Sequence, residues 1–187
     1  MEYPNIVEGM FLSRPNRFIA QVEIGGREET CHVKNTGRCR ELLVPGCRVY
    51  LVHSDNPARK TRYDLVAVQK GRRLINMDSQ APNKVVQEWL EGGDLPGVTL
   101  VRPETTYDQS RFDFYFEQGR RKAFMEVKGV TLEEKGVVRF PDAPTARGSK
   151  HLHELVKAHQ EGYDVYLFLV IQMADVDHFE PNWRTDP

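Results

Sequence analysis

Cysteine, long apolar runs and an excess of charge of one sign are all scarce in this chain of 187 residues. Its three cysteines are an odd number and form no CxxC pair, which argues against a disulfide framework or a zinc site and favours a reducing cytoplasm. The longest apolar run, residues 165–171, falls well short of the roughly 18 residues of a membrane-spanning helix. The N-terminus lacks a basic stretch followed by an apolar core, so we expect no signal peptide and no membrane partner.

Charge is nearly balanced but unevenly distributed. Lysine and arginine number 26 against 27 aspartates and glutamates, and 40% of the residues are hydrophobic, which is the composition of one ordinary globular domain or two small ones. Residues 59–73, however, contain six basic side chains and one acidic side chain, Asp64. A local excess of this kind can neutralise nucleic-acid phosphates. Solvated strand edges also collect lysine and arginine, so this segment leaves both interpretations open.

The first 80 residues show short strand patterns separated by turn residues. Candidate strands occupy residues 18–24, 30–34, 47–53, 64–70 and 74–77, and one helical turn is predicted at 37–43, before Pro45 and Gly46. Several short strands with turn signals are typical of a small barrel or sandwich. The size of the segment and its basic turns favour an oligonucleotide-binding-type (OB-like) β-barrel for residues 1–80.

The pattern changes after residue 80. Asn83 is suited to cap a helix that ends before Gly92 and Gly93. Further elements are predicted in the order strand, strand, strand, polar loop, amphipathic helix and apolar strand, at residues 98–102, 111–117, 122–128, 129–148, 150–160 and 163–171. The last strand is almost continuously apolar, as in a central strand buried on both faces. Residues 81–187 are therefore predicted to form an α/β domain with a mixed sheet and flanking helices, and the whole chain a two-domain α+β protein.

Two neighbouring strands of this second domain contain the residues of greatest chemical interest. Asp113 lies between phenylalanines, and strict alternation places it on the face opposite to Phe112, Phe114 and Phe116. In the next strand Glu126 and Lys128 share a face. Pairing of the two strands as a hairpin would bring the two carboxylates together, with the lysine beside them.

This arrangement suits metal-dependent cleavage of phosphodiesters. Asp113 and Glu126 offer oxygen ligands for Mg²⁺ or Mn²⁺, with the carbonyl of Val127 and waters completing the shell. A bound cation acidifies water and offsets phosphate charge, and Lys128 is suited to orient or deprotonate that water. E-x-K sequences are common, however. The simpler interpretation is a salt-bridged, exposed strand face, with Asp113 paired to Arg111.

The layout resembles the PD-(D/E)xK nuclease fold, and four longer segments strengthen the resemblance. Residues 32–38 (HVKNTGR), 110–114 (SRFDF), 126–132 (EVKGVTL) and 140–152 (FPDAPTARGSKHL) are similar to the sugar fermentation stimulation protein family. This resemblance implies an OB-type barrel, a PD-(D/E)xK nuclease-like domain and a DNA-binding role. Asp113 stands at the first acidic position, with Phe112 in place of the nuclease motif's proline. The family continues past residues 183–187 into a further helix and strand.

Other residues are candidates for binding the substrate or the metal. Contacts to phosphate or base are expected from the loop-to-helix segment, from the strand of Asp113 and from the barrel, through Arg147, Lys150, His151, Arg111, His32, Lys34, Asn35 and Arg38. Glu104 is a candidate third metal ligand, and Glu88 is a further candidate. Asp142 is either another acidic group near the metal or a turn residue between two prolines.

Three functions fit these patterns to different degrees. The first is a DNA-binding protein, with RNA as a further option, that contacts mainly the phosphate backbone and carries a Mg²⁺- or Mn²⁺-dependent nuclease site. The second is a non-catalytic DNA-binding regulator of sugar metabolism genes with a vestigial site. The third, a small-molecule hydrolase, lacks a G-x-S-x-G nucleophile motif. The sequence favours the first.

Overall fold

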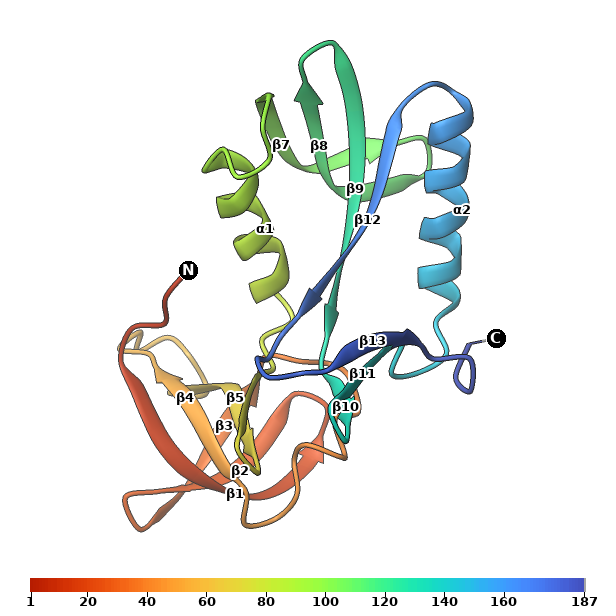
Figure 1. Ribbon diagram of the computed structural model, residues 1–187. Helices are drawn as coiled ribbons and strands as arrows, with labels where there is room; N and C mark the ends of the chain where they lie inside the picture. The colour runs from red at the N-terminus through yellow and green to blue at the C-terminus, as the bar shows by residue number, and fades with distance from the viewer. Residues whose placement is uncertain (187) are drawn as a thin grey trace.

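The computed structural model describes residues 1–186 and shows a two-domain α+β protein (Figure 1). The N-terminal domain is a β-barrel whose strands are β1 (Ile6–Asn16), β2 (Ile19–Ile24), β3 (Arg27–Val33), β4 (Arg48–His53), β5 (Tyr63–Lys70) and β6 (Arg73–Asn76). The ring closes in the order β1-β2-β3-β5-β4, with β3 and β5 parallel and the other neighbours antiparallel. The predicted OB-like barrel is therefore confirmed.

Two local predictions in the barrel were wrong or incomplete. Strand β1 was not predicted. Gly9 within this strand permits a very close approach of β2, because a Cβ atom at this position would lie 2.5 Å from a methyl carbon of Val22. The helical turn predicted at 37–43 is shorter in the structure, where only residues 40–42 form a turn. Leu42 and Leu43 both donate backbone hydrogen bonds to the carbonyl of Cys39, whose φ of 46° keeps the turn from beginning earlier in the chain.

The C-terminal domain is built on a four-stranded sheet between two helices (Figure 1). Its elements are α1 (Ala81–Glu91), β7 (Val98–Tyr107), β8 (Ser110–Gln118), β9 (Arg121–Val130), α2 (Ala146–Gln160) and β12 (Asp164–Ile171). The strand order is β12-β9-β8-β7, and β12 runs parallel to β9. Val86 and Leu90 of α1 pack on one face, Leu155 and Ala158 of α2 on the other. The predicted strand–helix–strand unit is confirmed.

Both helices begin earlier than predicted. Helix α1 starts at Ala81, with Pro82 in its first turn, where the missing N–H costs nothing. Asn83 is therefore not the N-cap, and its side chain is free to contact β8. Helix α2 starts at Ala146, and the hydroxyl of Thr145 accepts a hydrogen bond from the Gly148 backbone N–H, which caps the helix.

The prediction that β12 is a central strand buried on both faces was wrong. It forms an edge of the sheet, and Leu167 and Ile171 are 44% and 36% exposed. Phe168 packs against Trp89 of α1, with ring centroids 5.2 Å apart. The apolar run therefore combines one covered face with one that borders an open groove, and composition alone does not distinguish this from full burial.

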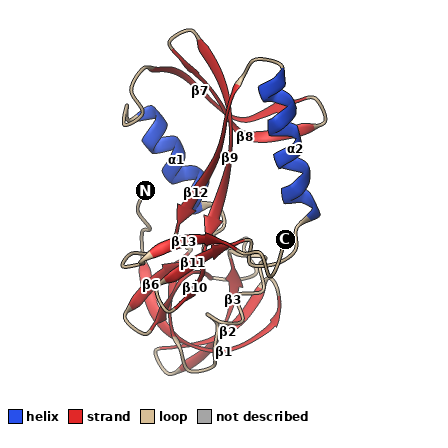
Figure 2. Cartoon of the chain, turned by 45° about the vertical axis from the view of Figure 1, so that its right-hand side comes forward, coloured by secondary structure: helices blue, strands red, loops and turns tan. Residues whose placement is uncertain are grey.

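The stretch 129–148 is not simply a polar loop. It contains β10 (Leu132–Glu134) and β11 (Val137–Phe140), which form a small sheet with β13 (His178–Pro181). Figure 2 shows this sheet between the barrel and the helices. Glu133 joins the domains, because its buried carboxylate binds Lys70 and Arg73 of the barrel at 2.9 and 3.1 Å. Within residues 1–186, no helix is both long enough and apolar enough to cross a membrane.

Candidate carboxylate site

The site forms where β8 and β9 separate. Their antiparallel pairing extends as far as Phe114 and Met125. Beyond this pair the Asp113 carboxylate replaces a backbone acceptor, and its Oδ2 atom accepts a 2.7 Å hydrogen bond from the Val127 backbone N–H. Oδ1 accepts a second, also 2.7 Å long, from the side-chain amide of Asn83 on α1. Asp113 is thus fixed at its place by both a strand and a helix.

This separation also overturns the expected alternation of the phenylalanines. Phe114 and Phe116 pack with α1, whereas Phe112 packs with Phe124 and α2 on the opposite side of the sheet. The strand changes direction around Asp113, so the three phenylalanines do not share a face. The aspartate side chain consequently points across the gap towards β9.

Glu126 is the buried centre of the site. The residue is 2% exposed, and its Oε1 atom is contacted by both Lys128 Nζ and His151 Nδ1. The other oxygen, Oε2, is buried without a hydrogen-bond partner. A buried carboxylate oxygen is costly to leave unpaired, so this atom is the one to which an additional ligand would bind most favourably. The E-x-K pair is therefore not an exposed salt bridge.

The electrostatics of the pair favour a cation. Burial raises the pKa of Asp113, and the nearby charge of Glu126 raises it further, against the lowering effect of the Val127 N–H and of Asn83. Two carboxylates held together in this way are each easier to ionise when a positive charge lies between them. Within residues 1–186 no group of three or more His, Cys, Asp and Glu side chains is placed to hold a metal. A cation here would bind the two carboxylates and complete its shell with backbone oxygen or water.

A pocket of about 210 Å³ opens onto these residues. Glu104 and Arg111 both line it and form a 2.8 Å ion pair with each other, so the simpler interpretation, in which Arg111 pairs with Asp113, is wrong. Glu88 contacts the N-terminal ammonium group and is not among the residues that line the pocket. The remaining lining residues are Ser79, Asn83, Asp113, Glu126, Val127, Lys128, Arg147 and His151.

Comparisons with known proteins agree with this architecture. Residues 12–77 match the model of the SfsA N-terminal OB domain, and residues 80–187 match that of the sugar fermentation stimulation protein RE domain. The chain belongs to the sugar fermentation stimulation protein family. It is 62% identical to a homolog from Desulfitobacterium hafniense (strain DSM 10664 / DCB-2), over 99% of this chain and 81% of that protein. A homolog from Clostridium beijerinckii is 61% identical, over 99% and 82% of the two chains.

A solved structure supports the same assignment. The SfsA protein of Pyrococcus furiosus, described in complex with Ca²⁺, is 29% identical and superimposes with a TM-score of 0.90. The match covers 100% of this chain and 81% of that one. The barrel and the α/β domain therefore have the arrangement found in a family member.

The residues expected to bind nucleic acid fall into two groups in this chain. Arg111, Arg147 and His151 line the carboxylate pocket, although His151 does so as a partner of Glu126. Lys150 is exposed on α2 and does not line the pocket.

Sequence reasoning missed Ser79 entirely and assigned Asn83 to helix capping. An asparagine near a helix N-terminus can either cap the helix or bind a side chain of another element, as Asn83 binds Asp113. The local sequence does not distinguish these two roles.

The candidates in the barrel mostly have structural partners. Lys34 forms a 2.8 Å ion pair with Asp78, whose side chain is fully buried. The Asn35 side chain donates to the Met77 carbonyl at 2.9 Å. These contacts join the barrel to the start of α1.

His32 is likewise engaged. Its Nδ1 atom lies 2.9 Å from Asp64, which also binds Arg59. Burial alone would raise the pKa of Asp64, but the hydrogen bonds from Arg59 and His32 outweigh it and hold that pKa below its usual range. Of the four barrel candidates only Arg38 is exposed.

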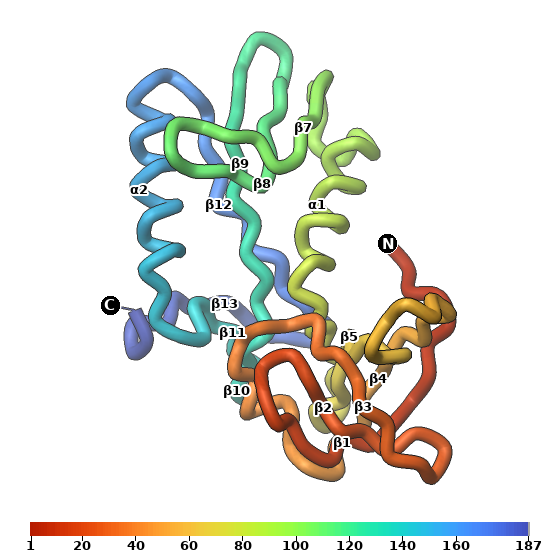
Figure 3. The backbone as a smooth tube through the Cα atoms, turned by 180° about the vertical axis from the view of Figure 1, so that it is seen from behind, coloured from red at the N-terminus to blue at the C-terminus, as the bar shows by residue number. Residues whose placement is uncertain are grey.

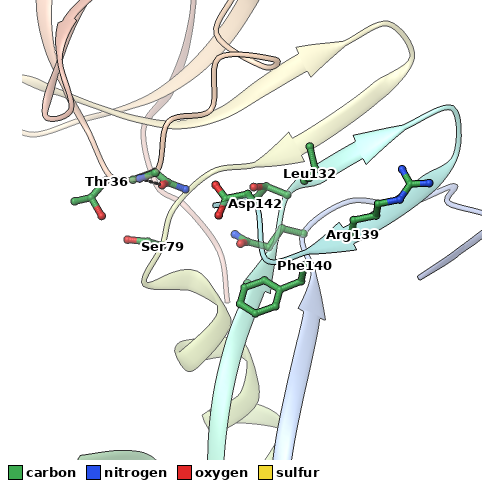
Figure 4. Close-up of a pocket in the computed structure, with 11 residues that line it drawn as sticks. Thr36, Ser79, Leu132, Arg139, Phe140 and Asp142 are labelled. Carbon is green, nitrogen blue, oxygen red and sulfur yellow. Dashed lines mark hydrogen bonds between the residues drawn. The ribbon is translucent and has the colours of Figure 1, made fainter. Parts of the chain in front are cut away.

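A second cavity, of about 260 Å³, lies between the domains (Figure 4). Figure 4 shows Asp142 directed into it, with Thr36 and Ser79 on the opposite side. Asp142 lines this cavity and not the carboxylate pocket, so it is not an additional acidic group beside Glu126. The full lining is Asn35, Thr36, Gly37, Ser79, Gly129, Thr131, Leu132, Arg139, Phe140, Asp142 and Gln172.

Proposed function

We propose that this protein binds nucleic acid, DNA in the first instance, and hydrolyses its phosphodiester bonds with the help of Mg²⁺ or Mn²⁺ at the carboxylate site. The observation that carries the proposal is the unpartnered, buried Oε2 atom of Glu126 beside Asp113, in a pocket that also contains Arg147. The complex of the Pyrococcus furiosus protein with Ca²⁺ adds support, because Ca²⁺ and Mg²⁺ both prefer oxygen ligands.

The side chains of the pocket have separate tasks in this reaction. A divalent cation bound here would acidify a water molecule and offset negative charge on the phosphate. Asp113 and Glu126 hold the cation, Lys128 orients the attacking water, and Arg147 donates charge-assisted hydrogen bonds to the phosphate. Water oxygen attacks phosphorus and gives up one proton to solvent, the bond to one sugar oxygen breaks, and that oxygen takes up a proton from solvent as it leaves. His151 keeps Glu126 in position through its Nδ1 atom.

A second candidate function is DNA binding without cleavage, as in a regulator of sugar metabolism genes. It is favoured by one observation: Lys128 contacts Glu126 directly, so the glutamate already has a cationic partner. Both functions require backbone binding that weakens as salt is raised. They differ in whether a divalent cation turns binding into cleavage.

The experiment that separates them measures cleavage of labelled single- and double-stranded DNA and RNA with Mg²⁺, Mn²⁺ or EDTA. Wild type is compared with Glu126→Gln and Lys128→Ala. Glu28→Gln and Lys122→Ala are matched controls, because both side chains are exposed and lie outside the pocket. Metal-dependent cleavage lost only in the first pair supports a nuclease. Salt-sensitive binding without cleavage supports the regulator, and absence of binding contradicts both.

A further inference from the structure

A strongly basic hollow of about 480 Å³ lies on the barrel, where the β1–β2 turn meets the β3–β4 connection. Three exposed arginines line it: Arg17, Arg38 and Arg40. In the part of the chain that the structure describes, the arginine ion pairs involve other arginines, and none joins any of these three to a carboxylate. The hollow therefore holds three arginines whose charges are not neutralised within residues 1–186.

The walls of the hollow are fixed by a fourth arginine. Arg14 Nη1 donates to the carbonyl of Arg38 at 2.8 Å, and Nη2 donates to the carbonyls of Arg17 and Asn35, both at 2.7 Å. Asn16 fixes the turn itself, since its side-chain oxygen accepts from two backbone N–H groups at 2.9 and 3.1 Å. A binding surface ordered in advance loses less entropy when a ligand binds.

The basic hollow connects with the carboxylate pocket through shared residues. Gly37 lines both the hollow and the interdomain cavity, and Ser79 lines both that cavity and the carboxylate pocket. The β3–β4 connection passes along the end of the α/β domain that faces the barrel (Figure 3). The Ser79 N–H donates to the Lys34 carbonyl at 2.8 Å. The hollow and the carboxylate pocket therefore lie along one line of contacts at the boundary between the domains.

We propose that Arg17, Arg38 and Arg40 form a phosphate subsite, which holds a nucleic-acid strand at a second point away from the phosphate at Glu126. The guanidinium fork matches phosphate oxygens and binds them in a bidentate manner. The subsite rests on the proposed function and extends it: the substrate is a polymer bound at two points, not a short phosphate ester. A strand that reaches both points gains affinity through the high effective concentration of the second contact.

The test uses Glu126→Gln protein, so that binding is measured without cleavage. Fluorescent single-stranded deoxyoligonucleotides of about 2 to about 12 nucleotides are titrated at several salt concentrations. We expect Kd to fall at least about tenfold between the shortest strands and those that span both points. The triple variant Arg17→Ala, Arg38→Ala and Arg40→Ala should lose this gain, and its salt slope should fall by about 0.7 for each phosphate contact removed.

The matched control removes three exposed barrel arginines outside the hollow, through Arg27→Ala, Arg62→Ala and Arg72→Ala. Equal weakening by the two triple variants, or no dependence on strand length, overturns the subsite while the proposed function stands. Absence of any binding to the Glu126→Gln protein overturns both. Thermal melts verify folding, and Arg40→Glu alone replaces the triple variant if that variant does not fold.

Discussion

His151 on α2 and Glu126 on β9 lie 25 residues apart in the chain, yet imidazole Nδ1 contacts carboxylate Oε1 directly. Lys128 contacts the same oxygen, so two cationic or donor groups fix one side of the carboxylate and leave Oε2 without a partner. The histidine therefore positions Glu126 and leaves Oε2 open to the cation proposed above. Outer-shell partners of this kind fix ligand geometry.

Replacing this imidazole should weaken metal binding. We expect His151→Ala to lower Mn²⁺ affinity about 10- to 100-fold, as for other partners of metal ligands. His151→Asn should retain more of the affinity, because its amide can donate from near the Nδ1 position. Calorimetric titration with Mn²⁺ measures both. His153→Ala, on an exposed face of the same helix, is the control. Wild-type affinity in His151→Ala would contradict the positioning role.

Divalent cations should stabilise the folded chain. At a concentration of about 100 times Kd, Mn²⁺ or Mg²⁺ adds about 2.7 kcal/mol to the free energy of unfolding. For a chain of this size that raises Tm by about 5–10 °C. EDTA should reverse the increase, and Asp113→Asn should prevent it. Scanning calorimetry with and without metal is the measurement, and an equal rise in Asp113→Asn would place the metal elsewhere.

The Lys34–Asp78 pair should contribute to stability and not to nucleic-acid binding. Lys34→Met leaves the buried carboxylate of Asp78 without its cation, which costs about 3 kcal/mol. Asp78→Asn in the same chain should recover part of that loss. Arg38→Ala should leave stability unchanged, since its side chain is exposed. Urea unfolding of wild type, Lys34→Met, Asp78→Asn, the double variant and Arg38→Ala tests this, and additive losses in the double variant would show that the pair is not coupled.

Acid should weaken the junction between the domains. Burial alone would raise the pKa of Glu133, but hydrogen bonds from Lys70 and the Gly136 N–H, together with the charge of Arg73, lower it below its usual value. A carboxyl with a lowered folded-state pKa stabilises the fold above its unfolded pKa of about 4.3, and this contribution is lost as the pH falls through the folded value.

Glu133→Gln should therefore cost about 2 kcal/mol at neutral pH and much less in acid. The free energy of unfolding, measured from neutral pH down to about pH 3, should converge for the two proteins as Glu133 protonates. Glu134→Gln on the exposed neighbour is the control. A difference that stays constant across the pH range would show that the ion cluster does not account for the loss.

The parts of the fold that depend on local pattern were predictable, and those set by distant contacts were not. Alternation correctly places Glu126 and Lys128 together, with Met125 and Val127 packed on the opposite face. The partnership with His151 depends on how α2 rotates over the sheet, which no local pattern encodes. Similarly, the apolar run of β12 indicates a strand but not its position at the edge of the sheet.

The separation of β8 from β9 illustrates the same limit. Strict alternation assumes a regular strand, and Asp113 lies where regular pairing ends. Its side chain replaces a backbone partner by accepting the Val127 N–H, a choice that depends on the neighbouring strand. Asn83 is a parallel case: its type fits a helix cap, and only the placement of α1 against β8 gives it the carboxylate as partner.

Strand β9 has a mechanical consequence for communication between the domains. It carries Glu126 and ends at Val130, and after Thr131 alone the chain enters β10, whose Glu133 is anchored to the barrel. Because this link is a single residue, it cannot lengthen appreciably. A rotation of the barrel therefore pulls on the same strand that holds the buried carboxylate, so a load applied to one domain is transmitted along the backbone to the carboxylate site of the other.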